Sequence, residues 1–513
     1  MTSHTESSTT ASPPAGSAVT DASAARSALA MPYSHVDDMF IDGAWTPAVG
    51  TGRNPVTDPA TGEVWGSVPD GSAEDVDAAV VSARRAFAGE WPRLTPTERA
   101  QYLVRIADEI EKRATELSLT NTRENGSPVS ESSGAAANAA GILRYFASLA
   151  DYLEREDVRA FPRGGGESVV RRDPAGVCAL IAPWNFPINL VVIKLAPALL
   201  AGCTVVIKPA SPTPLSIRFI IDAVAAAGVP AGVVNLITGT GRLGDALVRH
   251  PGVDKVAFTG STPVGRRIAA ASGELLRPVT LELGGKSSAI VMPDADLDAM
   301  ASVLIRSCMR NTGQTCYIST RILAPASRYD EVVDVVTATI AAGQQGDPLD
   351  PATVFGPTAT EAQFRTVLDY VESGRAEGAR ATTGGRAAQL SGGLEGGYFI
   401  EPTVFADVEP WMRISREEIF GPVLSVLKYS TIDEAIELAN NTDFGLGGIV
   451  FGEDESAALA VADRMDTGSV GINFFASNHA APFGGRHDSG LGTEYGIEGL
   501  NAYLTYKSIH RRG

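Results

Sequence analysis

Five apolar runs of strand length alternate with helical segments between Gly176 and Leu283, and this alternation restricts the fold more than any other feature. The runs cover residues 176–182, 204–207, 233–238, 255–258 and 279–283, and the helical segments cover roughly 188–201, 215–227, 243–250 and 264–272. Strands that are apolar along their whole length are buried on both faces, which is typical of parallel sheets covered by helices. We therefore predict a doubly wound α/β domain that binds ligands beyond the carboxyl ends of its strands.

The segments on either side of this unit add further elements. Residues 36–70 contain short apolar runs separated by turn dipeptides, which predicts small strands. Two helices are expected next, one capped by Ser72 and one opened by Thr95, a proline and Glu98, a capping box. From about residue 286 to 485 the pattern is again mixed and contains many glycine-rich turns.

Length and charge exclude several classes of protein. A chain of 513 residues is too long for one hydrophobic core. With 44% hydrophobic and 20% charged residues it has an ordinary globular composition. The formal net charge of −18 argues against nucleic acid and anionic membrane surfaces as partners, since both attract basic proteins.

The N-terminus and the cysteines bear on the location of the protein in the cell. Twenty of the first thirty residues are Ser, Thr or Ala, so we predict a disordered tail over residues 1–35 rather than a secretory signal. The most apolar stretch, 188–207, is interrupted by polar residues, Pro and Gly, which argues against a membrane span. The four cysteines lack CxxC spacing, so we expect reduced thiols, no metal site and a cytoplasmic protein.

A glycine motif, Gly239-Thr-Gly241-Arg-Leu-Gly244, follows one predicted strand and precedes a helix. This spacing matches the dinucleotide fingerprint, in which a pyrophosphate lies on the helix N-terminus. The fingerprint also requires an acid about 20 residues further on, but residues 257–264 contain none. Two interpretations stay open, a pyrophosphate site or a tight turn near the cofactor.

Seven short blocks, in this order, make up the most specific pattern in the chain. Four of them come at the expected carboxyl ends of the strands. The blocks are PWNFP (183–187), KPAS (208–211), FTGSTPVG (258–265), LELGGK (281–286), NTGQTC (311–316), EEIFGP (417–422) and PFGG (482–485) with Ser489-Gly490. Together they resemble the aldehyde dehydrogenase superfamily, and the resemblance runs from about residue 36 to the C-terminus.

The resemblance implies an architecture of three parts. A Rossmann-type NAD(P)-binding domain would comprise residues 36–150 and 173–284, and an α/β catalytic domain residues 285–485. Residues 151–172 and 486–513 would form a β arm used in oligomerisation, with a hairpin turn at 163–166. The expected assembly is a homodimer or a homotetramer.

The same resemblance implies the catalytic residues. Cys316 would be the nucleophile, and it lies in a polar, Gly-containing segment, whereas Cys178 and Cys203 lie in apolar runs. The Asn185 amide would stabilise the oxyanion, and Glu282 would be the general base. Lys194 would help to move protons, although a surface lysine is an equally good interpretation. Both residues also have a structural interpretation. Asn185 would then be a turn residue, and Glu282 an acid that caps a nearby backbone turn.

For the cofactor, NAD or NADP, the resemblance implies a set of contacts along the strand ends. Lys208 would bond the adenosine ribose, and Glu418 the nicotinamide ribose, with Phe420 packed beside it. Ser211 stands where many NAD-preferring members have Glu, so the 2′-phosphate of NADP should be tolerated. The remaining expected contacts are Trp184, Gly241, Gly260 and Ser261.

The identity of the aldehyde is less constrained. Some semialdehyde dehydrogenases use two arginines to hold a carboxylate, and this chain has Ile193 at the first place and Arg310 at the second. His487 stands where a lysine is usual. Four aromatic residues suggest an apolar funnel for aliphatic, aromatic or terpenoid aldehydes, namely Phe186, Tyr317, Phe474 and Phe475.

Several alternatives to a hydrolytic aldehyde dehydrogenase remain. A semialdehyde dehydrogenase would act on a carboxylate-bearing aldehyde. A CoA-acylating enzyme commonly lacks the base, so Glu282 speaks against it. The two remaining alternatives are a catalytically silent cofactor-binding protein and a cysteine hydrolase that uses no nicotinamide.

Overall fold

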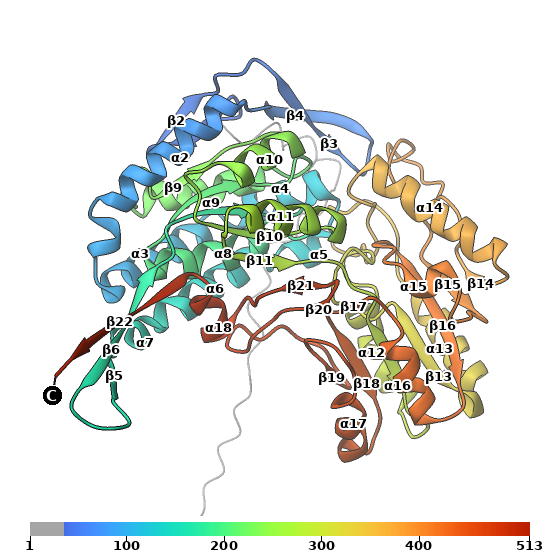
Figure 1. Ribbon diagram of the computed structural model, residues 1–513. Coiled ribbons are helices and arrows are strands. Elements are labelled where there is room, and N and C mark those ends of the chain that lie inside the picture. Colours follow the sequence, from blue (N-terminus) through green and yellow to red (C-terminus); the bar gives the residue numbers. More distant parts are fainter. Residues whose placement is uncertain (1–34, 513) are drawn as a thin grey trace, which may run out of the picture.

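The computed structural model describes residues 35–512 and confirms the predicted α/β class (Figure 1). The tail predicted for residues 1–35 lies outside the described residues except for His35. Two large sheets form the body of the molecule, and a small sheet extends from it.

The first sheet contains the predicted parallel strands. Their order is β9 (Val234–Leu236), β8 (Thr204–Lys208), β7 (Val177–Ile181), β10 (Lys255–Thr259) and β11 (Val279–Glu282). Antiparallel strands border both edges, β1 (Asp38–Ile41) with β2 (Ala44–Pro47) beside β9, and β21 (Gly490–Leu491) beside β11. The direction of chain progression reverses between β7 and β10, and ligands of doubly wound sheets bind at such a point.

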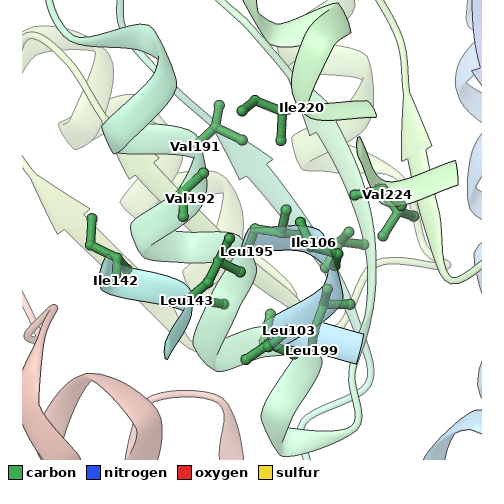
Figure 2. Packing of buried hydrophobic residues seen from close by; sticks show 14 of the residues in the cluster. Leu103, Ile106, Ile142, Leu143, Val191, Val192, Leu195, Leu199, Ile220 and Val224 are labelled. Carbon is green, nitrogen blue, oxygen red and sulfur yellow. The ribbon is translucent and has the colours of Figure 1, made fainter. Parts of the chain in front are cut away.

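Helices cover both faces of this sheet. Alternate residues of β7 point to opposite sides, with Cys178 and Leu180 in one core cluster and Val177 and Ala179 in the other. The first cluster includes α3 (Pro96–Glu111), α6 (Ala135–Ser148), α8 (Pro187–Ala201) and α9 (Ser216–Ala226), whose packed side chains are shown in Figure 2. The second includes α2 (Ala73–Ala88), α10 (Gly241–Arg249) and α11 (Thr262–Glu274). The capping box predicted at Thr95 and Glu98 is present.

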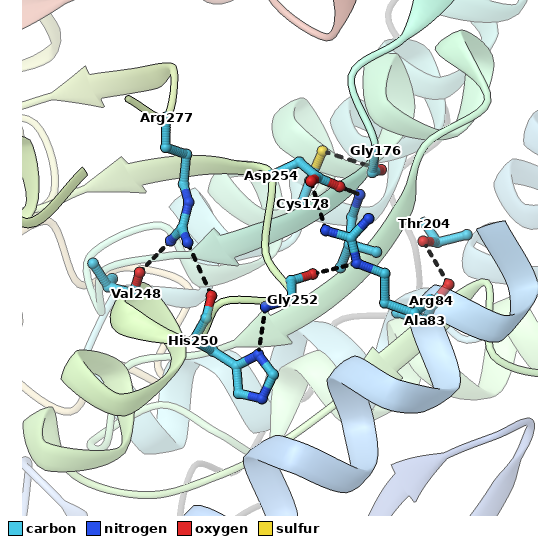
Figure 3. Close-up of polar contacts among 11 residues, drawn as sticks. Ala83, Arg84, Gly176, Cys178, Thr204, Val248, His250, Gly252, Asp254 and Arg277 are labelled. Atoms are coloured by element: carbon cyan, nitrogen blue, oxygen red, sulfur yellow. Dashed lines mark hydrogen bonds and ion pairs between the residues drawn. The ribbon is translucent and has the colours of Figure 1, made fainter. Parts of the chain in front are cut away.

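Polar contacts fix the amino ends of the strands of the first sheet, opposite the ligand-binding edge (Figure 3). Arg84 of α2 donates from Nη2 to Asp254 Oδ1 at 2.5 Å and from Nε to the Gly252 carbonyl at 2.7 Å. Asp254 Oδ2 accepts from the Val177 N–H at 2.7 Å. Helix α2, β7 and the loop before β10 are therefore held at one place, which leaves the carboxyl ends free for function.

The second sheet has the order β14-β15-β16-β13-β12-β18-β19 and is parallel apart from β14. Its strands are β12 (Ser288–Val291), β13 (Arg321–Pro325), β14 (Arg380–Thr383), β15 (Thr403–Ala406), β16 (Val423–Tyr429), β18 (Gly448–Phe451) and β19 (Gly471–Ile472). Helices α12 (Leu297–Cys308) and α13 (Tyr329–Ala341) cover one face. Helices α14 (Glu361–Ala376), α16 (Ile432–Asn440) and α17 (Glu455–Ala462) cover the other.

A three-stranded antiparallel sheet, β22-β6-β5, projects from the body (Figure 1). It consists of β5 (Asp157–Ala160), β6 (Glu167–Pro174) and β22 (Leu504–Arg511). Gly164 and Gly165, with φ of 72° and 83°, form the turn at the predicted place. Within the predicted range 486–513, β21 pairs with the first large sheet, so it is Leu504–Arg511 that builds the arm.

Smaller elements complete the chain. Strands β3 (Arg53–Asp58) and β4 (Glu63–Pro69) form a hairpin in the region where small strands are predicted. Strand β17 (Phe444–Gly445) pairs with β20 (Arg486–His487). Over residues 35–512, no helix is long and apolar enough to cross a membrane.

Candidate active site

Cys316 lies on a loop wound in an unusual conformation after α12. Asn311, Thr312 and Gly313 have consecutive positive φ angles of 52°, 56° and 76°. A Cβ on Gly313 would lie 1.9 Å from the Gly421 carbonyl oxygen, so only glycine permits this contact. The loop is therefore pressed against the EIFGP block, which fixes the position of Cys316. The other cysteines are buried in the hydrophobic cores.

Two further blocks, LELGGK and PFGG, lie close to this loop. A Cβ on Gly285 would lie 2.2 Å from the Cys316 carbonyl oxygen, and the Gly285 N–H donates to Glu418 Oε1 at 2.9 Å. A Cβ on Gly484 would lie 3.4 Å from Glu282 Oε1. Cys316, Glu282 and Glu418 are thus gathered in one cluster, although they come from segments far apart in the sequence.

Asn185 joins this cluster from the turn after β7. Its backbone carbonyl accepts from the side-chain amides of Asn125 and Asn311, both at 3.2 Å, which fixes the turn. Its own Nδ2 donates to the Gln314 carbonyl at 3.0 Å. An amide nitrogen carries two N–H groups, so a second donor is available beside the cysteine loop. Asn185 and Cys316 line the same cavity.

Burial sets the protonation of the two reactive groups. The Glu282 carboxyl is buried, and neither oxygen has a hydrogen-bond partner within residues 35–512. Burial and the nearby Glu494 raise the pKa of Glu282 well above its ordinary value, with Lys194 acting in the opposite direction. Burial, Glu418 and Glu282 likewise raise the pKa of the Cys316 thiol. The thiol must therefore lose its proton before it can attack.

Lys194 is fully buried, so the surface-lysine interpretation is wrong. Its Nζ donates to Glu494 Oε1 and to Thr259 Oγ1, both at 2.6 Å. Glu494 also acts on Glu282, which places the three groups in one buried network. Sequence reasoning missed Glu494 because it lies 300 residues from Lys194 in a short segment between β21 and α18 (Gly496–Asn501), where no local pattern marks it.

Most of the predicted cofactor contacts lie along the carboxyl edge of the first sheet, whereas Glu418 and Phe420 come from the loop before β16 of the second sheet. Lys208 ends β8 and is buried, and burial lowers its pKa to about 8. A Cβ on Gly244 would lie 3.4 Å from Lys208 Cδ, so the glycine motif lies directly against this lysine. Ser211 Oγ donates to the Gly239 carbonyl at 2.9 Å. The motif begins α10 after β9, as its position in the sequence predicts.

Two more groups line this edge near the chain reversal. Gly260 and Ser261 connect β10 to the N-terminus of α11, a position suited to a phosphate. Trp184 contacts Phe420 edge to face, with ring centroids 5.3 Å apart. Burial raises the pKa of Glu418 to about 7. A buried lysine, an open helix N-terminus and an acceptor carboxylate along one edge fit a dinucleotide.

A cavity of about 280 Å³ leads to Cys316 and Asn185. Its aromatic lining residues are Phe186, Tyr317, Phe475, Phe483 and Tyr495. Phe474 does not line this cavity: its side chain is 62% exposed and lines a neighbouring surface pocket together with Phe475. Phe475 instead stacks on Tyr317 with ring centroids 4.9 Å apart.

Two remaining features concern His487 and possible metal ligands. His487 lies at the surface, where its Nε2 forms a hydrogen bond of 2.6 Å with Asp466 Oδ2. Within the described part of the chain, no three His, Cys, Asp or Glu residues are grouped as a metal site would require.

Comparison with known proteins completes the description of the site. The family model described as "Aldehyde dehydrogenase family" matches residues 45–509. Geranial dehydrogenase of Castellaniella defragrans is 47% identical over 487 residues, which cover 94% of this chain and 100% of that protein.

Two solved structures resemble this chain in sequence and in fold. One is aldehyde dehydrogenase C of Pseudomonas syringae, a cysteine-to-alanine mutant with NAD+ and octanal, at 41% identity and a TM-score of 0.89 over 93% of this chain and 96% of that chain. The other is a Mycobacterium tuberculosis aldehyde dehydrogenase with NAD+, at 42% identity and a TM-score of 0.89 over 92% of this chain and 97% of that chain.

Proposed function

The chain belongs to the aldehyde dehydrogenase family and is an NAD(P)-dependent enzyme, and from this premise we propose that it oxidises an aldehyde to a carboxylic acid through a thioester on Cys316. The observation that carries the proposal is that Cys316 and Asn185 line one cavity, while the buried Glu282 carboxyl lies close enough to act on the Cys316 thiol. The overall reaction consumes an aldehyde, NAD(P)+ and water, and yields the acid, NAD(P)H and a proton.

The first half of the reaction needs a nucleophile and an oxyanion site. The Cys316 thiol releases its proton to water, its sulfur bonds to the aldehyde carbon, and the carbonyl oxygen takes the electron pair of the C=O bond. The free N–H of the Asn185 amide and the backbone N–H of Cys316 stabilise this oxygen. The bound nicotinamide supplies the hydride acceptor, and Lys208, Ser261 and Glu418 would hold the cofactor.

The second half releases the product. Glu282 accepts a proton from water, and the hydroxide attacks the thioester carbon, which breaks the C–S bond. Lys194 and Glu494 then offer a buried route by which the proton can leave Glu282. The test is product analysis: without CoA, the enzyme should form one carboxylic acid and one reduced nicotinamide for each aldehyde consumed. A requirement for CoA would contradict hydrolysis.

The aldehyde we propose has an apolar body. Five aromatic side chains line the cavity. Relatives named for geranial and a structure holding octanal support the same chemical class. A carboxylate-bearing semialdehyde is the second candidate, because Arg310 lines the cavity.

The oxyanion role of Asn185 gives a quantitative prediction. We expect Asn185→Ala to lower kcat by roughly 10²–10³-fold, the usual effect of removing one oxyanion donor. The measurement is pre-steady-state formation of reduced nicotinamide, so that hydride transfer is observed directly. Asn189 lines the same cavity, and Asn189→Ala serves as a matched amide control. A loss below about tenfold would assign the donor role to another group.

Cofactor choice gives a second prediction. Ser211 puts a neutral hydroxyl where a carboxylate would repel a 2′-phosphate, and the neighbouring Asp70 carboxylate is offset by Arg242 at 3.7 Å and the Thr240 N–H at 3.1 Å. We expect NADP+ to be used at a rate comparable to NAD+, and Ser211→Glu to shift the ratio of kcat/KM values towards NAD+ by about tenfold or more. Ser211→Gln is the neutral control of the same size. An unchanged ratio would show that Ser211 is not the selector.

The assembly we propose is a homodimer or homotetramer joined through the arm. Apolar side chains on the arm are exposed, including Val158, Phe161, Tyr506 and Ile509. Exposed apolar side chains beside unpaired strand edges favour pairing with another chain. The molar mass in solution, measured by light scattering, distinguishes these assemblies from a monomer.

A further inference from the structure

Arg310 and Glu131 face each other in the wall of the aldehyde cavity, which both line together with Cys316. Arg310 donates to Glu131 Oε1 from Nε at 2.6 Å and also from Nη2. Its Nη1 donates to the Tyr317 hydroxyl at 2.6 Å, and its Cζ lies 5.1 Å from the centre of the Phe186 ring. The donor fork of the guanidinium is therefore occupied by groups of the protein itself.

The pair is held from both sides by packed structure. Glu131 belongs to α5 (Val129–Ser132), where the Ser132 hydroxyl bonds with Ser118 and Thr122 at 3.1 and 2.6 Å. On the other side, Thr315 Oγ1 donates to the Arg310 carbonyl at 3.1 Å, within the loop that carries Cys316. The pair thus needs no rearrangement to form, and it lies beside the reacting thiol.

An arginine exposed in such a cavity would bind a carboxylate with two parallel hydrogen bonds. Here an incoming carboxylate has to displace the Glu131 carboxylate from Arg310. The displaced Glu131 carboxylate would stay partly buried, next to the negative charge of the substrate. Arg306, the other arginine that lines the cavity, is exposed and forms no ion pair with any of residues 35–512. Water and salt weaken its attraction for a substrate.

We propose that Glu131 is a specificity-determining residue: by occupying Arg310, it makes the cavity select aldehydes with an uncharged tail over aldehydes whose tail ends in a carboxylate. This inference rests on the proposed function, because it assumes that the cavity at Cys316 takes an aldehyde. It also explains how Arg310 can be present without making the enzyme a semialdehyde dehydrogenase.

The test compares two aldehydes of equal carbon number, adipate semialdehyde and hexanal, by the ratio of their kcat/KM values. The native enzyme should prefer hexanal. Glu131→Gln keeps the shape of the side chain but removes the charge, so the ratio should move towards adipate semialdehyde by roughly tenfold or more, the scale of one charge-assisted hydrogen bond. A ratio within each variant is insensitive to a general loss of activity.

Two control variants locate the effect. In Glu131→Gln/Arg310→Gln, the gain for adipate semialdehyde should disappear, because the cation that binds the carboxylate is gone. Arg306→Gln, at the rim, should change the ratio by less than about threefold. An unchanged ratio in Glu131→Gln, or a gain that survives the loss of Arg310, would overturn the proposal.

A binding measurement in the native protein gives an independent check. Hexanoate should slow the alkylation of Cys316 by iodoacetamide, whereas adipate at the same concentration and ionic strength should not; equal protection would overturn the proposal. Failure of the proposed function looks different, since the native enzyme would then reduce NAD+ with neither aldehyde. Hexanal turnover with an unchanged ratio contradicts the role of Glu131 alone.

Discussion

Replacing Cys316 with Ala is expected to lower aldehyde-dependent reduction of NAD+ by roughly 10⁴-fold or more, the scale seen when a catalytic nucleophile is removed. No other cysteine can substitute, because Cys178, Cys203 and Cys308 are all buried away from the cavity. Cofactor affinity should change little, since Cys316 is not among the proposed cofactor contacts. Turnover and the Kd for NAD+, measured by titration calorimetry, check both parts.

Cys308→Ala is the matched control, because this cysteine lies eight residues upstream, in the core at the end of α12. It should lose stability through a small cavity while keeping turnover. Substantial activity in Cys316→Ala, or an equal loss in Cys308→Ala, would remove Cys316 from the mechanism.

Glu282→Gln is expected to separate the two halves of the reaction. Acylation needs the thiol and the oxyanion donors, whereas hydrolysis needs a base for water. The variant should therefore release up to one equivalent of reduced nicotinamide per active site in a burst, followed by turnover slowed roughly 10²–10⁴-fold. Stopped-flow absorbance records both phases. No burst at all would show that Glu282 is needed for acylation as well, and native turnover would show that another group is the base.

The pH dependence of the deacylation rate follows from the Glu282 carboxyl. Burial raises the pKa of Glu282, and only the deprotonated form can accept a proton from water. Deacylation should therefore rise with pH through an inflection above the ordinary value of 4.5 and then level off. Glu282→Gln should lack this inflection.

Much of the fold was predictable because it depends on local patterns. Fully apolar strands such as β7 and β8 are recognisable one at a time, and their helices follow from spacing and caps. The positions of Lys208 and Glu282 follow as well, since the carboxyl ends of parallel strands share one edge. Cys316 was marked by its polar, glycine-containing surroundings, which differ from those of a core cysteine.

The rest depends on contacts between distant segments. Glu494 meets Lys194 across 300 residues, and Glu131 meets Arg310 across 179. Nothing near either acid in the sequence indicates its partner. Phe474 and Phe475 are adjacent in the sequence, but only Phe475 lines the cavity, and nothing in the composition distinguishes the two residues.

Intact-mass spectrometry of Glu282→Gln shows whether Cys316 holds the acyl group. After mixing with NAD+ and hexanal and quenching in acid, the protein should gain the mass of the aldehyde less two hydrogens, as expected for a thioester. Peptide mapping should place this addition on Cys316, and hydroxylamine should remove it. An unmodified protein that has nevertheless formed reduced nicotinamide, or an acyl group on another residue, would contradict the account.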